Sequence, residues 1–183
     1  MKRFAAPLAI SCLTFFSASA QNAPAALPTV DSHGDWLTRC FAIQSETPCD
    51  AMIALIDGTT KQRVLSLSLA YKPSRDQYVM QLAVPLMVSI PDGAVIEAPG
   101  YRSGALFIRR CDRGGCYIEM AVSPELIAGL KAAGSAGGDV IVTTPQGKAV
   151  TIKFSLKGFG DAVDAMVSKA REKATNSTTG SAP

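Results

Sequence analysis

Histidine is almost absent from this chain of 183 residues, which contains His33 alone. Histidine is the side chain whose ordinary pKa lies near neutrality, so its scarcity argues against Ser-His-Asp chemistry and against histidine-based proton transfer. The sequence also lacks a G-x-S-x-G elbow, an H-E-x-x-H helix, a P-loop and a G-x-G-x-x-G turn. We therefore expect no catalytic residue, no metal site and no cofactor, and we predict that the protein is not an enzyme.

Charge is also sparse, since only 18% of the residues are charged and the formal net charge is +3. A nucleic-acid-binding protein would need a dense basic face, and this class is excluded. Glycine and proline occur at ordinary frequency and 48% of the residues are hydrophobic, which excludes collagen-like and mainly disordered chains. The length fits one globular domain.

The N-terminus has the pattern of an export signal. Residues 1–20 begin with Lys2 and Arg3, continue as an apolar run and end in the small residues A-S-A at Ala20. This pattern predicts a secretory signal peptide cleaved after Ala20. The apolar run is shorter than the roughly 18 residues that a membrane span needs, and a lipoprotein signal that uses Cys12 fits less well. We expect a periplasmic or secreted protein with no transmembrane segment in the mature chain.

Four cysteines remain after the predicted cleavage, namely Cys40, Cys49, Cys111 and Cys116. In an oxidising compartment an even number of cysteines predicts disulfides, here two. Four cysteines allow three pairings, and the short separations favour Cys40–Cys49 and Cys111–Cys116. The spacing does not suit a zinc site, and C-D-R-G-G-C between two predicted strands does not suit a redox-active C-x-x-C motif.

The composition divides the chain into four parts. Residues 21–33 are rich in alanine and proline and are predicted to be a flexible leader. Residues 34–173 are predicted to form the folded domain, and residues 174–183 a disordered polar tail. Because His33 adjoins the leader, we expect it to be mobile.

Within the domain, apolar residues recur at every second position, as in Leu65, Leu67 and Leu69. This alternation is typical of strands with one buried and one solvated face. The fold class predicted is mainly β, a single-domain β-sandwich or partly closed barrel of about nine short strands. The strands are expected at 35–42, 50–56, 65–69, 77–84, 94–98, 105–111, 116–122, 140–144 and 150–156.

Two helices interrupt the strand pattern. The first begins at Pro124, which suits the first helical position, and ends before Gly134. The second has apolar residues at helical spacing from Phe159 to Ala170, which predicts a C-terminal amphipathic helix packed on the sheet.

Several short motifs occur in a recognisable order. They are G-D-W at Gly34–Trp36 ahead of Cys40, V-P-L followed by P-D-G, the loop C-D-R-G-G-C, the helix S-P-E-L-I-A-G-L, and L-x-G-F at Leu156–Phe159. In this order the chain resembles the invasion-associated locus B family of bacterial envelope proteins, over almost the whole mature domain. The resemblance implies a secreted or periplasmic β-rich protein and transfers no catalytic residues. The family pattern has a glycine after V-P-L, where this chain has Met87.

Some charged and aromatic residues are candidates for a functional site. The carboxylate pairs Asp31/Asp35 and Asp161/Asp164 are expected to be solvated, and Trp36 is expected in the core, over a disulfide. Arginines gather around the second cysteine pair, where they suit an anionic group or simply protect a hairpin edge. They are Arg102, Arg109, Arg110 and Arg113.

Two function classes follow. The first is an exported, non-catalytic binding or accessory module of the envelope, which the family name connects with host-cell invasion. The alternative is a periplasmic enzyme with an unrecognised active site. We expect the first, with an unidentified envelope or host-surface protein as partner and with Arg110, Arg113 and Tyr117 as the binding residues.

Overall fold

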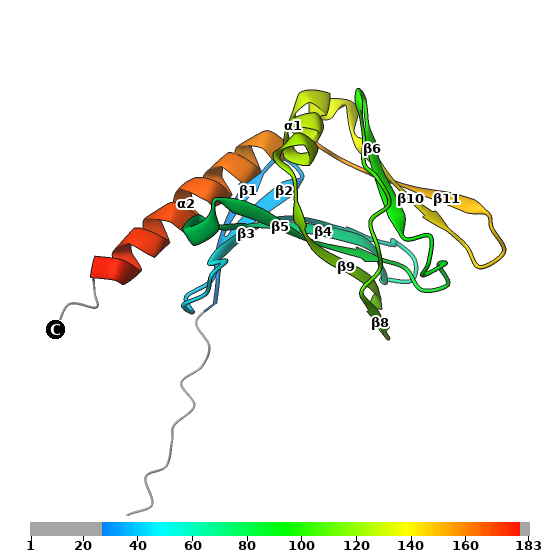
Figure 1. Ribbon diagram of the computed structural model, residues 1–183, viewed down its shortest axis with the longest axis horizontal. Helices are drawn as coiled ribbons and strands as arrows, with labels where there is room; N and C mark the ends of the chain where they lie inside the picture. Colours follow the sequence, from blue (N-terminus) through cyan, green and yellow to red (C-terminus); the bar gives the residue numbers. More distant parts are fainter. Residues whose placement is uncertain (1–26, 180–183) are drawn as a thin grey trace, which may run out of the picture.

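The computed structural model describes residues 27–179, so the predicted signal peptide lies outside the described residues. The chain forms two antiparallel β-sheets and two α-helices (Figure 1). The two sheets meet near α1 and diverge toward the end that carries the β10–β11 hairpin, while α2 lies on the other half of the larger sheet (Figure 1).

The larger sheet has seven strands in the order β1-β2-β3-β4-β5-β9-β8. Consecutive strands pair as hairpins, and β9 returns to lie beside β5. The strands are β1 (Thr29–His33), β2 (Trp36–Cys40), β3 (Cys49–Ile56), β4 (Arg63–Lys72), β5 (Gln77–Val84), β8 (Arg110–Asp112) and β9 (Gly115–Val122).

The smaller sheet has four strands in the order β11-β10-β6-β7. These are β6 (Ala94–Ala98), β7 (Tyr101–Arg102), β10 (Gly138–Thr143) and β11 (Ala149–Phe154). The helices are α1 (Pro124–Ala133) and α2 (Phe159–Thr179), and two single 3-10 turns, η1 (Pro73–Arg75) and η2 (Gly134–Ala136), complete the described elements.

The core lies between the larger sheet and the layer that covers it. The alternating Leu65, Leu67 and Leu69 of β4 are fully buried, as the two-residue period predicts. From α2 the apolar stripe packs over β2, β3 and β4, and within this contact the rings of Trp36 and Phe159 meet edge to face with centroids 4.8 Å apart. The predicted mainly β class is confirmed as two packed sheets that do not close into a barrel.

One strand lies where a flexible leader was predicted. Residues 29–33 form β1, which pairs along its whole length with β2. The prediction of a flexible leader was wrong for these residues, and so was the prediction of a mobile His33. The side chains of β1 are mostly exposed, so its sequence lacks the alternation of apolar and polar residues that predicts a strand. Pairing here comes from the backbone, and Gly34, at φ +59°, makes the tight turn between the two strands.

The predicted tail also begins too early, because α2 continues through residues 174–179. Asparagine, serine and threonine are weak helix formers, but a helix that is already anchored by packing propagates at little further cost. Nothing in the local composition signals that extension.

The strand predicted at 105–111 is also wrong. Leu106 forms an isolated bridge with Ala94, and regular pairing resumes only at Arg110 in β8. This segment passes from the smaller sheet to the larger one, so a single continuous strand cannot pair with both.

Candidate functional site

The β8–β9 hairpin lies at one edge of the larger sheet and carries the residues predicted to bind. Cys111 lies opposite Cys116 in the register of the two strands, and a disulfide joins them. The other disulfide joins Cys40 and Cys49, which are opposite each other on β2 and β3. The structure thus has the two disulfides between cysteines close in sequence, and each disulfide joins two neighbouring antiparallel strands.

Arg110 and Tyr117 face each other across this hairpin. The guanidinium carbon of Arg110 lies 4.0 Å from the centroid of the Tyr117 ring, a cation–π contact. Arg110 also forms ion pairs with Asp112 at 2.9 Å and with Glu119 at 3.0 Å. The pKa of Arg110 is raised, first by the hydrogen bond to Glu119, so its positive charge is held in place by its neighbours.

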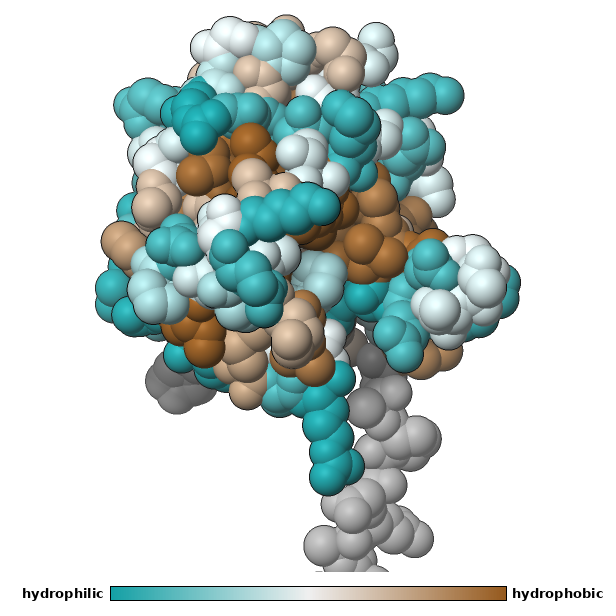
Figure 2. Space-filling model, turned by 90° about the vertical axis from the view of Figure 1, so that its right-hand side faces the viewer, coloured by the Kyte–Doolittle hydropathy of each residue, from teal (hydrophilic) through white to brown (hydrophobic). Residues whose placement is uncertain are grey.

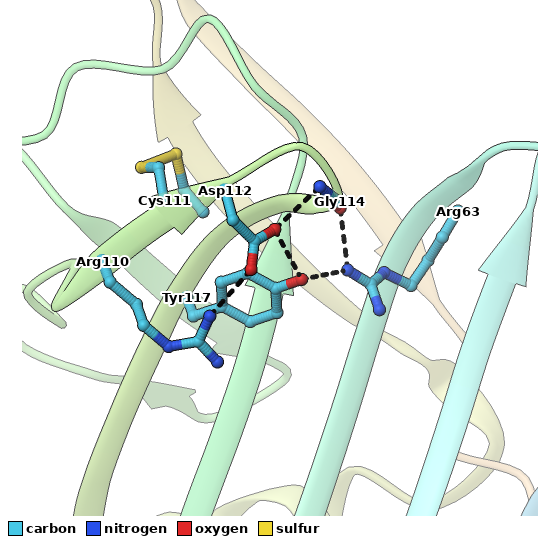
Figure 3. The surroundings of a disulfide bond; sticks show 7 residues. Arg63, Arg110, Cys111, Asp112, Gly114 and Tyr117 are labelled. Atoms are coloured by element: carbon cyan, nitrogen blue, oxygen red, sulfur yellow. Dashed lines mark hydrogen bonds and ion pairs between the residues drawn. A yellow bond between two sulfur atoms is a disulfide. The ribbon is translucent and has the colours of Figure 1, made fainter.

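Arg63 completes the cluster from β4, which is two strands away from β9 in the sheet (Figure 3). Its guanidinium donates hydrogen bonds to the carbonyl oxygen of Gly114 at 2.8 Å and to the hydroxyl of Tyr117 at 3.0 Å. Sequence reasoning missed Arg63, because only the strand order brings it to a hairpin more than 50 residues further along the chain.

The tip of the hairpin is held by Asp112 and two glycines. Asp112 Oδ1 accepts hydrogen bonds from the Gly114 amide at 2.7 Å and from the Tyr117 hydroxyl at 3.2 Å. The hydrogen bond from the Gly114 amide lowers the pKa of Asp112 the most. The Tyr117 hydroxyl and Arg110 lower this pKa further. At Gly115 a Cβ would lie 2.5 Å from the carbonyl oxygen of Val84, so no other residue fits. The tip is therefore a fixed structure rather than a loose loop.

The other three candidate arginines of the sequence analysis do not all lie near the hairpin. Arg109 and Arg113 are exposed, and neither side chain has an ion pair within residues 27–179. Arg102 does not belong to the hairpin, because it lies in β7 of the smaller sheet and pairs there with Glu97. Placing Arg102 around the disulfide loop from its sequence position was wrong, since β7 and β8 belong to different sheets.

An open hollow of about 660 Å³ lies beside the β6–β7 turn. Glu97 and Asp139, opposite each other on β6 and β10, contribute two carboxylates to it. Each is already paired with a cation from a neighbouring strand, Glu97 with Arg102 and Asp139 with Lys153. The hollow presents balanced charge pairs rather than free carboxylates.

The carboxylate pairs considered from sequence are exposed, as expected, and each pair includes a carboxylate that joins two elements. Asp31 pairs with Lys169 of α2 at 2.7 Å, and the hydrogen bond from Lys169 lowers the pKa of Asp31. Asp35 accepts a hydrogen bond from Ser155 Oγ at 2.6 Å. Asp164 of the second pair binds Lys131 of α1 at 2.5 Å, while Asp161 is exposed at the start of α2. These contacts are structural.

His33 lies apart from the hairpin, at the end of β1. Its Nε2 atom is buried and has no hydrogen-bond partner in the part of the chain that the structure describes. Its carbonyl oxygen is approached so closely by Gly158 that a Cβ on the glycine would lie 2.0 Å away. His33 therefore lies in a tightly packed backbone junction between β1 and the start of α2.

Within residues 27–179 no cluster of three or more His, Cys, Asp or Glu side chains is arranged to hold a metal ion. Among the same residues, the helices are all too short or too polar to span a membrane.

Comparison with known proteins finds a family and a similar fold. A model of the family described as "Invasion associated locus B (IalB) protein" matches residues 36–167. The fold is similar to the crystal structure of invasion associated protein B from Bartonella henselae, with a TM-score of 0.65 and 16% sequence identity over 76% of this chain and 96% of that one. At this identity the structural match bears on the fold alone. No curated protein matches the chain.

Proposed function

The chain belongs to the invasion-associated locus B family, and from that premise we propose that it is an exported accessory module of the bacterial envelope, which acts by binding rather than by turnover. Its partner is an envelope or host-surface protein, and the contact surface is the β8–β9 hairpin. The name of the Bartonella relative connects that protein with invasion, and a role of the present chain in host entry is part of the proposal.

The observation that carries this proposal is the internal bracing of the hairpin. Arg63, Asp112 and the disulfide hold the tip before any partner arrives. A surface that is already ordered loses little conformational entropy on binding. The cation–π pair of Tyr117 and Arg110 then provides the contact surface for the partner. Arg113, at the tip of the same hairpin, is exposed and has no ion pair among the described residues.

The alternative is a periplasmic enzyme. Its place would be the hollow beside the β6–β7 turn, where Glu97 and Asp139 face each other. General acid–base catalysis by two carboxyl groups requires one of them to be protonated. Burial of a carboxyl group, or a like charge beside it, favours the protonated form. Both carboxylates here have a cation as a neighbour, and this supports binding over turnover.

The family and the disulfides fit an extracytoplasmic protein. We propose the periplasm or the exterior of the cell, reached through a signal peptide at residues 1–20. N-terminal sequencing of the exported protein should begin at Gln21. A product that starts at a lipidated Cys12, or that retains Met1, would contradict this route.

The binding proposal is tested by crosslinking in intact cells followed by mass spectrometry. Replacing Arg110→Ala and Arg113→Ala together should lower the yield of the crosslinked partner by about tenfold, because both side chains lie in the proposed contact. Arg75→Ala, at an exposed arginine of η1, is the matched control and should leave the yield unchanged. Unchanged capture in the double variant would move the surface elsewhere. A turnover that Glu97→Gln abolishes would replace the binding function with an enzymatic one.

A further inference from the structure

The end of the molecule where the two sheets diverge carries an exposed apolar surface. Ten large apolar side chains are exposed among the described residues, and five of them belong to this end. Figure 2 looks at this side of the molecule and shows several groups of hydrophobic residues with hydrophilic residues between and around them. We call this surface the apolar end, formed by Leu86, Met87, Ile90, Phe107 and Val150.

Three separate segments meet at the apolar end. The loop of residues 85–93 is held to β10 by a hydrogen bond from the Ser89 amide to the carbonyl oxygen of Thr143, at 2.6 Å. Within that loop Gly93 lies against Phe107, since a Cβ on it would be 3.4 Å from the Phe107 Cα. Val150 joins them through the register of the smaller sheet, where Val142 pairs with both Val150 and Ala94.

Met87 is held in a conformation that an apolar residue rarely adopts. Its φ is +65°, in the left-handed region, and its side chain is 74% exposed. The backbone strain therefore costs free energy, and the mostly exposed side chain recovers little of it by packing within this chain. Phe107, at 63% exposed, likewise places a large ring in solvent. Residues of this size gain free energy only when another surface covers them.

Basic side chains surround the apolar end. Arg109 follows Phe107 by two residues and Lys148 precedes Val150 by two, and both are exposed. One exposed acid, Asp92, lies in the loop of residues 85–93. The rim is thus cationic, although the chain as a whole carries only +3. A cationic rim complements an anionic surface.

We propose that the apolar end docks onto the surface of an anionic phospholipid bilayer. Two hollows in the described part of the chain, one beside the β6–β7 turn and one between the loop of residues 42–48 and α2, lie elsewhere. Apolar side chains carried on separate segments of the chain suit a fluid surface that adapts to each of them. Phe107, Met87 and Ile90 enter the boundary between headgroups and acyl chains, and Arg109 and Lys148 contact lipid phosphates.

Vesicle flotation tests this directly, with the chain of residues 21–183, which contains every described residue. Vesicles of phosphatidylethanolamine and phosphatidylglycerol should carry the protein, and vesicles of phosphatidylcholine alone should carry much less of it. The double variant Met87→Gly with Phe107→Ser should bind the anionic vesicles at least about tenfold more weakly, since two large side chains no longer enter the bilayer. Glycine fits the φ of Met87, so this replacement removes the side chain without straining the fold.

Two further variants separate the contributions. Ile43→Ser removes an equally exposed apolar side chain from the loop beside α2 and should bind as wild type. Arg109→Gln with Lys148→Gln should weaken binding to anionic vesicles by about fivefold for each charge removed.

Absence of flotation with the anionic vesicles would overturn the proposal, and so would equal binding by the Met87/Phe107 variant. Self-association in solution that the same variant abolishes would assign the apolar end to a second copy instead. The assay contains no other protein, so its result is independent of partner capture through Arg110 and Arg113.

Discussion

Arg171 of α2 donates a hydrogen bond from Nη2 to the hydroxyl oxygen of Tyr71 on β4, at 2.8 Å. The Tyr71 hydroxyl in turn donates to the carboxylate of Asp76, and Arg171 pairs with the same carboxylate at 3.1 Å. The Tyr71 ring is buried beneath this triangle. Three side chains from two distant parts of the chain thus hold the C-terminal helix on the larger sheet.

Replacing Tyr71→Phe should lower the free energy of unfolding by about 1–2 kcal/mol, because the ring stays in place while the hydroxyl between Asp76 and Arg171 is lost. Urea unfolding measures this difference. Tyr78→Phe is the matched control, since its ring packs 5.3 Å from that of Tyr71 and its hydroxyl has no hydrogen bond within the described residues. Equal losses in the two variants would show that the Tyr71 hydroxyl contributes nothing.

Acid should weaken the same triangle. The hydroxyl of Tyr71, and then Arg171, lower the pKa of Asp76 from its ordinary value of 3.8. Because the folded-state pKa lies below the unfolded one, this contribution to stability is fully present above pH 3.8 and is lost as the pH falls through the lowered pKa. The Tm of Asp76→Asn should therefore fall less steeply with acid than that of wild type. Asp92→Asn, at an exposed carboxylate, should retain the wild-type slope, and an unchanged slope in Asp76→Asn would contradict the prediction.

Removal of the two disulfides should have unequal effects. In the chain-entropy model, bridges that close loops of this length contribute about 2–3 kcal/mol each. Replacing Cys111 and Cys116 by serine should cost about that amount. Replacing Cys40 and Cys49 should cost more, because two serine hydroxyls would then enter the core, whereas at the hairpin Cys116 is buried and Cys111 is exposed. Thermal unfolding of the two double variants measures the difference, and a larger loss at the hairpin would contradict the ordering.

Gly158 and Gly147 separate backbone strain from steric clash. Both have a positive φ, +83° and +79°, so alanine is strained at either position by about 1 kcal/mol. At Gly158 a Cβ would also lie 2.0 Å from the carbonyl oxygen of His33, whereas at Gly147 nothing lies within 4 Å. Gly158→Ala should therefore lower the free energy of unfolding by several kcal/mol, and Gly147→Ala by only about 1 kcal/mol. Similar chemical-denaturation midpoints for the two variants would show that the junction relaxes.

Local patterns predicted the elements that have a buried face. The period of two at Leu65, Leu67 and Leu69 located β4, and the helical stripe beginning at Phe159 located α2, because burial imposes the period of the element on the sequence. β1 was missed for the same reason, since a strand with exposed side chains carries no such pattern. Its pairing depends on backbone groups, which every residue has.

The candidate site was only partly visible in the sequence. Arg110 and Tyr117 lie seven residues apart on two strands of one hairpin, so chain proximity was enough to place them together. Arg63 is 54 residues from Tyr117, and Arg102 is near the hairpin in sequence but belongs to the other sheet. Chain proximity therefore omitted one contributing arginine and included one that lies elsewhere.

The sequence by itself determined the mainly β character, the two helices and the residues that lie in the core, because these follow from local periodicity and from the solvation of each side chain. Only the tertiary structure decided the order of the strands, the assignment of β7 and β8 to different sheets, and the meeting of three separate segments at the apolar end. Those features depend on which strand edges pair. The backbone groups are the same in every strand, so the choice of partner strand follows from how side chains pack in the whole molecule.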